Sequence, residues 1–220
     1  MRLRSFYCLT ALLVASPAFA ESLYDDMDQS FPNAHTIIGN LLGLSDRVPA
    51  IRFQVDPLLD DQRFQVTEYS FRLRKEFQTA NPIMFSLHQD AGGKPGSVID
   101  IVQVTPVATI VDGGIYPVAS NFQPAIERGG LYWISARTST SWDGAYWQHT
   151  HRDTANRTMA FQSPSGEWTT DDLVWTGPAL RVLGVAVPEP STAALASFAA
   201  MLLLQRRQTS TQGRCQSDWK

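Results

Sequence analysis

The stretch Ile51-Arg52-Phe53-Gln54-Val55 alternates apolar and polar side chains, which is the period of a β-strand with one buried face. The alternation continues in Phe64–Val66 and resumes one residue out of phase in Tyr69–Leu73. A slip of one residue predicts a β-bulge, which we expect near Thr67 or Glu68. This part of the chain therefore predicts a β-sheet that buries one face.

Short segments with strand composition continue along the chain, separated by turn-forming stretches such as Ala91–Ser97. They are Ile83–Leu87, Val98–Val104, Ile115–Val118, Gly130–Ala136, Ala145–His149 and Ala179–Val185. Between Glu21 and Val187 the only helical signal is one turn expected around Ile37–Leu44, which two glycines weaken. We therefore expect an all-β fold, a jelly-roll-like β-sandwich rather than a closed barrel.

Residues 1–20 have the composition of a secretory signal peptide. Two arginines precede the apolar run Phe6–Ala15, and Ala18-Phe19-Ala20 is a small-x-small cleavage site. We expect signal peptidase to cleave at this site, so that the mature chain begins near Glu21 outside the cytoplasm.

The other end of the sequence has the pattern of a membrane stop. Val187-Pro188-Glu189-Pro190 precedes the apolar stretch Ala193–Leu204, which is followed by Arg206 and Arg207. A helix over that stretch would span about 18 Å, short of the roughly 30 Å hydrocarbon core. We expect a short hydrophobic helix that inserts transiently in the inner membrane, with both arginines on the cytoplasmic side. The alternative is an ordinary buried helix of the domain.

This tail resembles the PEP-CTERM sorting signal of exosortase substrates in Gram-negative bacteria. The resemblance implies processing at Pro188-Glu189-Pro190 by an exosortase-type enzyme, followed by release or re-anchoring at the cell surface. The chain departs from the usual pattern because Gln208–Lys220 follows the arginines. This extension contains few apolar residues, and we expect it to be disordered.

The region between the two ends resembles choice-of-anchor R domains. Gln78–Gln103 is similar to their hairpin of a strand, an acidic turn and a Gly-x-Pro-Gly motif, and Gly129–Ile134 is similar to their Tyr-Trp strand. Gly166–Trp168 and Pro178–Val182 follow in the same order. The resemblance covers about Ile51–Val185. It implies a β-sandwich in an extracellular setting, and it supplies no catalytic residues.

The expected organisation has five parts. They are a signal peptide (1–20), an irregular N-terminal arm (21–50), a choice-of-anchor R-like β-sandwich (51–186), a sorting signal with a short transmembrane stretch (187–207) and a disordered tail (208–220). Cys8 and Cys215, the two cysteines, lie in the first and last parts. The processed domain is therefore expected to lack disulfides, thiolate metal sites and a cysteine nucleophile.

Charge argues against two classes of partner. Residues 21–187 contain 12 Lys and Arg against 19 Asp and Glu, a net charge of −7. A domain this acidic is a poor candidate for binding nucleic acid or anionic lipid.

One weak metal pattern occurs. His149, His151 and Asp153 alternate along the chain, so on a strand they would face one side, and two imidazoles with a carboxylate suit zinc. The alternative, which we favour, is a polar edge that faces solvent.

Aromatic residues form the most suggestive cluster. They are Tyr132, Trp133, Trp142, Tyr146, Trp147, Trp168 and Trp175. A loop at Ser139–Gly144 could present Trp142 to the face of a sugar, with Tyr146 or Trp147 beside it and Asp143 or Gln148 bonding hydroxyls. The alternative, which we favour for the set, is that the rings fill the core.

Enzyme signatures are weak. The chain has no Gly-x-Ser-x-Gly elbow, no His-Glu-x-x-His helix and no dinucleotide fingerprint. We therefore expect a non-enzymatic, exported surface or extracellular-matrix protein without a cofactor. Its expected partners are signal peptidase and an exosortase-type enzyme. The alternative is a carbohydrate-binding module that recognises extracellular polysaccharide, and a secreted hydrolase is the third hypothesis.

Overall fold

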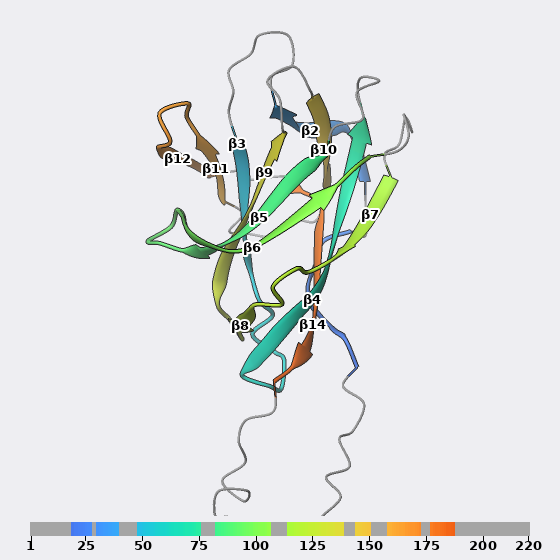
Figure 1. The fold of residues 1–220 in the computed structure, drawn as a ribbon, viewed down its shortest axis with the longest axis vertical. Helices are drawn as coiled ribbons and strands as arrows, with labels where there is room; N and C mark the ends of the chain where they lie inside the picture. The colour runs from blue at the N-terminus through green and yellow to red at the C-terminus, as the bar shows by residue number, and fades with distance from the viewer. Residues whose placement is uncertain are drawn as a thin grey trace, which may run out of the picture. The chain divides into compact units, whose positions relative to one another are not determined.

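The computed structural model describes residues 19–27, 30–39, 48–75, 82–106, 114–138, 144–150, 158–172 and 177–187. These residues form strands and no helix (Figure 1). The strands are β1 (Glu21–Asp25), β2 (Ser30–Gly39), β3 (Val48–Gln54), β4 (Arg63–Lys75), β5 (Ile83–Asp90), β6 (Pro95–Val104), β7 (Gly114–Ala119), β8 (Ala125–Glu127), β9 (Leu131–Thr138), β10 (Gly144–Thr150), β11 (Thr158–Gln162), β12 (Trp168–Asp172), β13 (Gly177–Pro178) and β14 (Leu180–Ala186). The all-β expectation is confirmed for this part of the chain.

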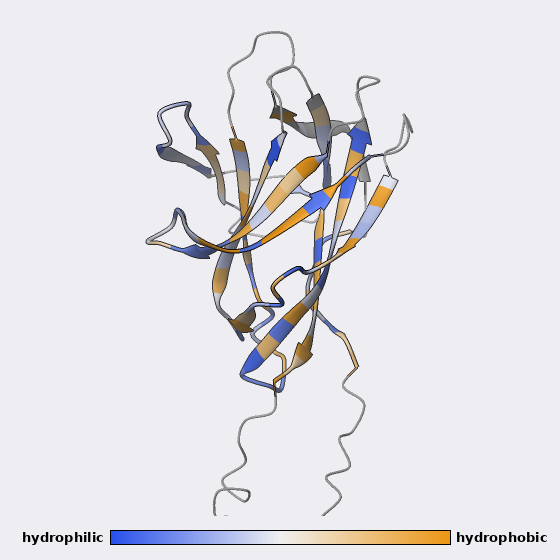
Figure 2. Ribbon diagram, in the orientation of Figure 1, coloured by the Kyte–Doolittle hydropathy of each residue, from blue (hydrophilic) through white to orange (hydrophobic). Residues whose placement is uncertain are grey.

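The strands make two antiparallel sheets. Sheet A has eight strands in the order β1-β14-β4-β10-β13, with β2 paired to β10 and with β7 and β8 paired to β4. Sheet B has six strands in the order β12-β11-β3-β9-β5-β6. Hydrophobic residues alternate with polar ones along the strands, as Figure 2 shows, because each strand turns one face to the core.

The predicted bulge lies in β4, at the residue where the sequence changes phase. Leu183 of β14 pairs with Glu68, but the next residue, Gly184, pairs with Val66. Thr67 is therefore the extra residue, and its Oγ1 donates a hydrogen bond to the Leu183 carbonyl at 3.3 Å. The bulge lets both apolar segments of β4 face the core, which is why one long strand can serve the whole sheet.

Aromatic rings from both sheets meet in the core. Phe71 of β4 stacks on Phe85 of β5, with ring centroids 3.7 Å apart and planes 12° apart. The Trp147 ring of β10 lies edge-on to both, at 5.9 Å and 5.2 Å. Its Nε1 donates a hydrogen bond to the Ala179 carbonyl at 2.9 Å, so the polar atom of the indole is paired inside the core.

The expectation of an irregular arm over residues 21–50 is wrong where the structure describes it. β1 and β2 belong to sheet A, and Leu23 and Ile38 are fully buried in the core. The helical turn expected around Ile37–Leu44 is also wrong for Ile37 and Ile38, which lie in β2; residues 40–44 lie outside the described residues. The segment is extended because its β-branched residues pair with β10, a contact that local sequence does not reveal.

Both ends of the domain lie at one edge of sheet A. Glu21, the first residue of β1, pairs with Gly184 near the end of β14. Residues 1–186 form one compact unit of the chain, and a second unit begins at Val187. Gly144 at the start of β10 pairs with Gly39 at the end of β2, and these residues lie at the opposite end of the sheet.

Several expectations fall outside the described residues. They concern the signal peptide (1–18), the sorting residues Pro188, Glu189, Pro190, Arg206 and Arg207, the apolar stretch Ala193–Leu204 and the tail (208–220). Among the described residues, no helix has the length and apolar character needed to cross a membrane.

Candidate functional site

The predicted sugar-contacting residues separate in the structure. Trp147 is fully buried, so the favoured interpretation, that its ring fills the core, is confirmed, and the alternative that it contacts a sugar is wrong. Tyr146, the next residue back, is partly exposed on the outer face of sheet A, where the guanidinium carbon of Arg74 lies 5.6 Å from the ring centroid. Trp142 and Asp143 lie outside the described residues.

His149 does not face solvent, which corrects the favoured interpretation of its segment. Its side chain is buried, and its Nε2 lies 2.6 Å from Oγ1 of Thr36 in β2. Alternation places it on the same face of β10 as Trp147, toward the core. His151 and Asp153 lie outside the described residues, so the three-residue metal hypothesis is untested; no metal-binding group of three ligands occurs among the residues that are described.

Neighbouring aromatic residues of β9 face opposite sides of sheet B, as alternation predicts. Tyr132 packs against the core with its ring centroid 6.0 Å from that of Phe53. Burial raises the pKa of the Tyr132 phenol, and its oxygen accepts a hydrogen bond from the Glu127 amide at 3.0 Å. Trp133 instead packs on the outer face of sheet B in a second, smaller cluster.

That outer cluster adjoins a group of hydrogen-bonded polar side chains on sheet B. We call this group the His88 cluster, and it consists of His88 and Asp90 from β5, Trp133 and Ser135 from β9, and Trp168 from β12. Register brings the first four together, because His88 pairs directly with Trp133 in the β5 and β9 ladder.

Hydrogen bonds fix the proton of the His88 imidazole. Nδ1 lies 3.0 Å from the carbonyl oxygen of Gly96, and Nε2 lies 2.8 Å from Oγ of Ser135. A carbonyl only accepts, so Nδ1 carries the proton and Nε2 accepts from the serine hydroxyl. Burial lowers the pKa of His88, partly offset by the bond to Gly96, and this favours the neutral ring.

Asp90 anchors the other side of the cluster. Its Oδ1 accepts a hydrogen bond from Trp133 Nε1 at 2.7 Å, and its Oδ2 accepts one from the Gly93 amide at 3.0 Å. The guanidinium carbon of Arg52 lies 5.8 Å from the Trp133 ring centroid, within cation–π range. The acidic turn seen in the sequence therefore positions the indole of the next strand.

Small side chains form the floor beneath Trp168. Ala160 pairs with Ala50, Ala50 with Ser135, and Ser135 with Ser86, so one row of short side chains crosses four strands. The ring of Trp168 packs against Ala50, Ala160 and Trp133. A large ring over a row of short side chains fills the depression that they leave.

The Trp168 contact also shows how sheet B is curved. Three strands separate β12 from β5, which in a flat sheet puts them about 19 Å apart at roughly 4.8 Å per strand. The rings of Trp168 and His88 nevertheless lie only 6.0 Å apart, edge to face. The hairpin of β11 and β12, drawn beside β3 in Figure 1, therefore curls back over the outer face.

Chemically, a serine hydroxyl bonded to a neutral imidazole is the arrangement of a nucleophile and its base. Two observations oppose that function here. His88 and Ser135 are each only 6 % exposed beneath Trp168. Ser135 also lies within a strand paired on both sides, so the amides around it are bonded in ladders and cannot stabilise an oxyanion. The cluster is best explained as packing that fastens the hairpin.

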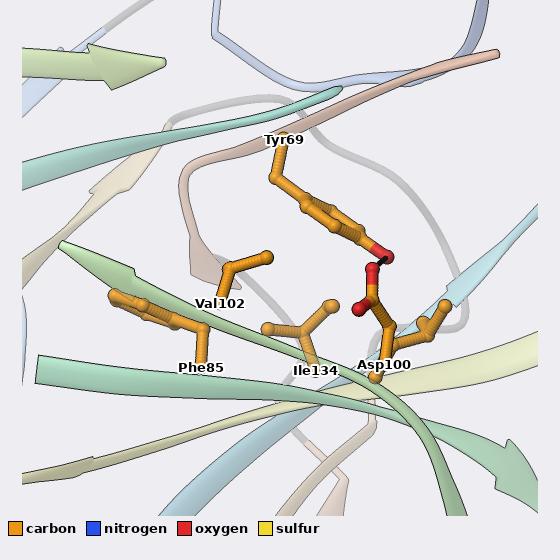
Figure 3. A pocket seen from close by; sticks show the side chains of 6 residues that line it. Tyr69, Phe85, Asp100, Val102 and Ile134 are labelled. Atoms are coloured by element: carbon orange, nitrogen blue, oxygen red, sulfur yellow. Dashed lines mark hydrogen bonds between the residues drawn. The ribbon is translucent and has the colours of Figure 1, made fainter. Parts of the chain in front are cut away.

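A second buried polar group joins the two sheets. The Tyr69 hydroxyl of β4 donates to Oδ2 of Asp100 in β6 at 2.9 Å, as Figure 3 shows, and the Ser120 hydroxyl donates to the same oxygen. The Ile101 and Phe122 amides donate to Oδ1. Burial, followed by the nearby Asp100 carboxyl, raises the pKa of Tyr69 far above its usual range. The space around Tyr69 and Asp100 has no room for a water molecule, so it is not a ligand pocket. The role of the pair is to link the two sheets.

Sequence reasoning missed His88, Asp90 and Ser135. Their signal was present, since His88 and Asp90 occupy the positions of β5 that alternate with its buried apolar residues. Their partners on β9 and β12 could not be found without the strand order.

No protein-family model matches the chain, and the search of curated proteins found no match.

Proposed function

We propose that this chain is an exported, non-enzymatic protein of the cell surface or extracellular matrix, sorted by an exosortase-type system. One observation carries the proposal. β1 begins at Glu21, the residue after the expected signal peptidase site, and β14 ends at Ala186, the residue before the expected sorting signal. The folded domain thus fills the interval between the two expected processing sites.

The first and last strands of the folded domain pair with each other, which favours processing of a folded domain. Because Glu21 pairs with Gly184, both sites adjoin the same edge of sheet A. A membrane-bound enzyme acting after Val187 would not need to open β14 or any strand of the core. The partners in this proposal are signal peptidase and the exosortase-type enzyme, and membrane insertion is transient because the apolar stretch is short. The resemblance to choice-of-anchor R domains and the jelly-roll topology stay predictions.

The termini of the mature protein test the proposal. Mass spectrometry of the protein from its native host should find Glu21 as the first residue and a last residue near Pro188-Glu189-Pro190. Replacing both prolines by alanine should let a helix extend toward Val187 and hide the sequence, so precursor should accumulate in the membrane fraction. Deleting residues 191–220 is the control and should send the domain to the periplasm or medium. A mature form that retains Ala193–Lys220 contradicts the proposal.

A second candidate, carbohydrate binding, is favoured by the partly exposed ring of Tyr146. This ring lies on the outer face of sheet A beside Arg74, and its strand begins directly after the segment that contains Trp142 and Asp143. An aromatic ring with neighbouring polar side chains suits a sugar face.

Polysaccharide pull-down of the secreted protein tests this candidate. Tyr146→Ala and Trp142→Ala should each reduce binding by at least tenfold if sugars stack there. Trp168→Ala, on the other sheet, is the matched control and should bind like the wild type. Equal binding by all three variants contradicts the site.

A further inference from the structure

Two buried polar atoms on the outer face of sheet A are left without a hydrogen-bond partner within the described part of the chain. They are Nε of Arg72, which can only donate, and Oε1 of Gln148, which can only accept. The Gln148 side chain is 2 % exposed, so bulk water does not satisfy its oxygen.

The two residues are neighbours in the β4 and β10 ladder. Leu73 pairs with Trp147 in antiparallel register, so Arg72 and Gln148 occupy the next position along the two strands. Leu73 and Trp147 point into the core, and alternation therefore turns Arg72 and Gln148 to the outer face.

The segment after β1 covers this position. Arg72 Nη2 donates to the Met27 carbonyl at 3.0 Å, and the Asp26 amide donates to the Leu180 carbonyl at 3.0 Å. The Ala179 amide donates to the Gln148 carbonyl at 2.8 Å, which holds β10 against the same region. Asp26 and Met27 are themselves buried. The side chain of Arg72 thus contacts the first residues that follow β1, and Gln148 is its neighbour in the ladder.

We propose that this position is a binding site for a hydroxyl group, which accepts a hydrogen bond from Arg72 Nε and donates one to Gln148 Oε1. Only a group that both accepts and donates satisfies the two atoms together. A carboxylate cannot donate to Oε1, and an ammonium cannot accept from Nε–H. Water and a sugar hydroxyl share the required chemistry. The enclosure of Gln148 favours one internal water, which would join Gln148 to Arg72, the residue that bonds the Met27 carbonyl after β1.

Thermal unfolding of the full-length protein distinguishes a filled site from two unpaired atoms. Gln148→Met keeps the length of the side chain and removes the acceptor. If a hydroxyl is bound, the melting temperature should fall by several degrees because the bridge is lost. If Oε1 is truly unpaired, the melting temperature should rise, since a buried polar atom has been removed, and the proposal is then wrong.

The donor side is tested by Arg72→Lys, which keeps a cation that can reach the Met27 carbonyl but has no Nε–H. Combined with Gln148→Met, it should cost less than the sum of the single effects, because both substitutions break the same bridge. Additive losses contradict the proposal.

Crystallography of the full-length protein identifies the occupant. Density for a single oxygen within about 3.2 Å of both atoms supports the proposal. A direct bond between Arg72 Nε and Gln148 Oε1 overturns it, as does the absence of density. A parallel crystal soaked in an oligosaccharide separates the sources: unchanged density identifies water, and a connected sugar ring identifies a sugar hydroxyl.

Discussion

His88 couples the outer face of sheet B to pH because its ring is buried and neutral. Burial holds the pKa of His88 below its ordinary value of 6.5. In the unfolded chain the ring binds a proton near pH 6.5, whereas in the folded protein it resists protonation. The unfolded state therefore binds more protons as pH falls, and the free energy of unfolding must decrease below about pH 6.5. Trp133 is the neighbour of His88 in the ladder, and the charged side chains of Asp90 and Arg52 contact its ring.

We predict that His88→Gln removes part of this pH dependence. The wild type should lose stability between about pH 7 and about pH 5, and the variant should lose less over the same interval because glutamine does not titrate there. Urea unfolding at each pH measures the difference. Ser86→Ala, two residues away on the same face of β5, keeps both hydrogen bonds of the imidazole and serves as the control, which should keep the wild-type slope. Identical slopes for His88→Gln and the wild type contradict the prediction.

Tyr69 gives a second prediction at this scale. Tyr69→Phe removes the hydroxyl that donates to Asp100 but keeps the ring, so the buried carboxyl loses one of its donors. We expect the free energy of unfolding to fall by about 1 to 3 kcal/mol. Tyr116→Phe, at a partly exposed position of β7, is the matched control and should change it by less than about 0.5 kcal/mol. Equal effects of the two substitutions would exclude a stabilising role for the link between the sheets.

At the scale of elements, the pairing of β1 with β14 depends on a glycine. A Cβ added at Gly184 would lie 2.5 Å from Leu23 Cδ1 and 2.8 Å from the Gln65 carbonyl oxygen. The leucine can shift, but the carbonyl oxygen belongs to the backbone of β4 and has little freedom to move. We predict that Gly184→Ala lowers the free energy of unfolding by about 1 to 3 kcal/mol through overpacking.

Denaturant unfolding of three variants tests this. Ser22→Ala, at an exposed position of β1, should behave like the wild type. Leu23→Ala combined with Gly184→Ala should not restore stability, because the contact with the carbonyl oxygen remains. Wild-type stability of Gly184→Ala would show that β1 can move away at no cost.

Individual strands show which parts of this fold could be predicted from the sequence. The bulge at Thr67 was predictable because the apolar residues of β4 change phase within one strand. β2 was not, because Ile37 and Ile38 are fixed by pairing with β10, far along the chain. The His88 cluster was missed for the same reason, since Ser135 and Trp168 reach His88 only through strand order and curvature. The favoured interpretation placed the aromatic rings in the core, and it holds for Trp147, which is fully buried.

At the scale of the whole molecule, the adjacency of the two ends allows the domain to be closed into a ring. Glu21 pairs with Gly184, and β14 continues for only two residues to Ala186. A linker of about five Gly and Ser residues, which reaches roughly 15 Å when extended, should therefore join Ala186 to Glu21 without strain. New ends can be placed at Gly92 and Gly93, in the turn between β5 and β6 where both glycines have positive φ.

We predict that this circular permutant folds, since it keeps every strand and changes only the turn in which the Ala91 amide bonds the Lys94 carbonyl and the Gly93 amide bonds the Asp90 carboxylate. Because it omits residues 1–20 and 187–220, it also tests whether the domain between the expected processing sites needs either end. Circular dichroism and a cooperative unfolding transition within a few degrees of the parent measure the outcome. A permutant opened within β4, between Phe71 and Arg72, is the control and should not fold, because it cuts the strand that pairs with β14, β10, β7 and β8. Failure of the permutant opened at Gly92 would mean that the domain depends on sequence beyond Glu21 and Ala186, and the export proposal would then lose its structural support.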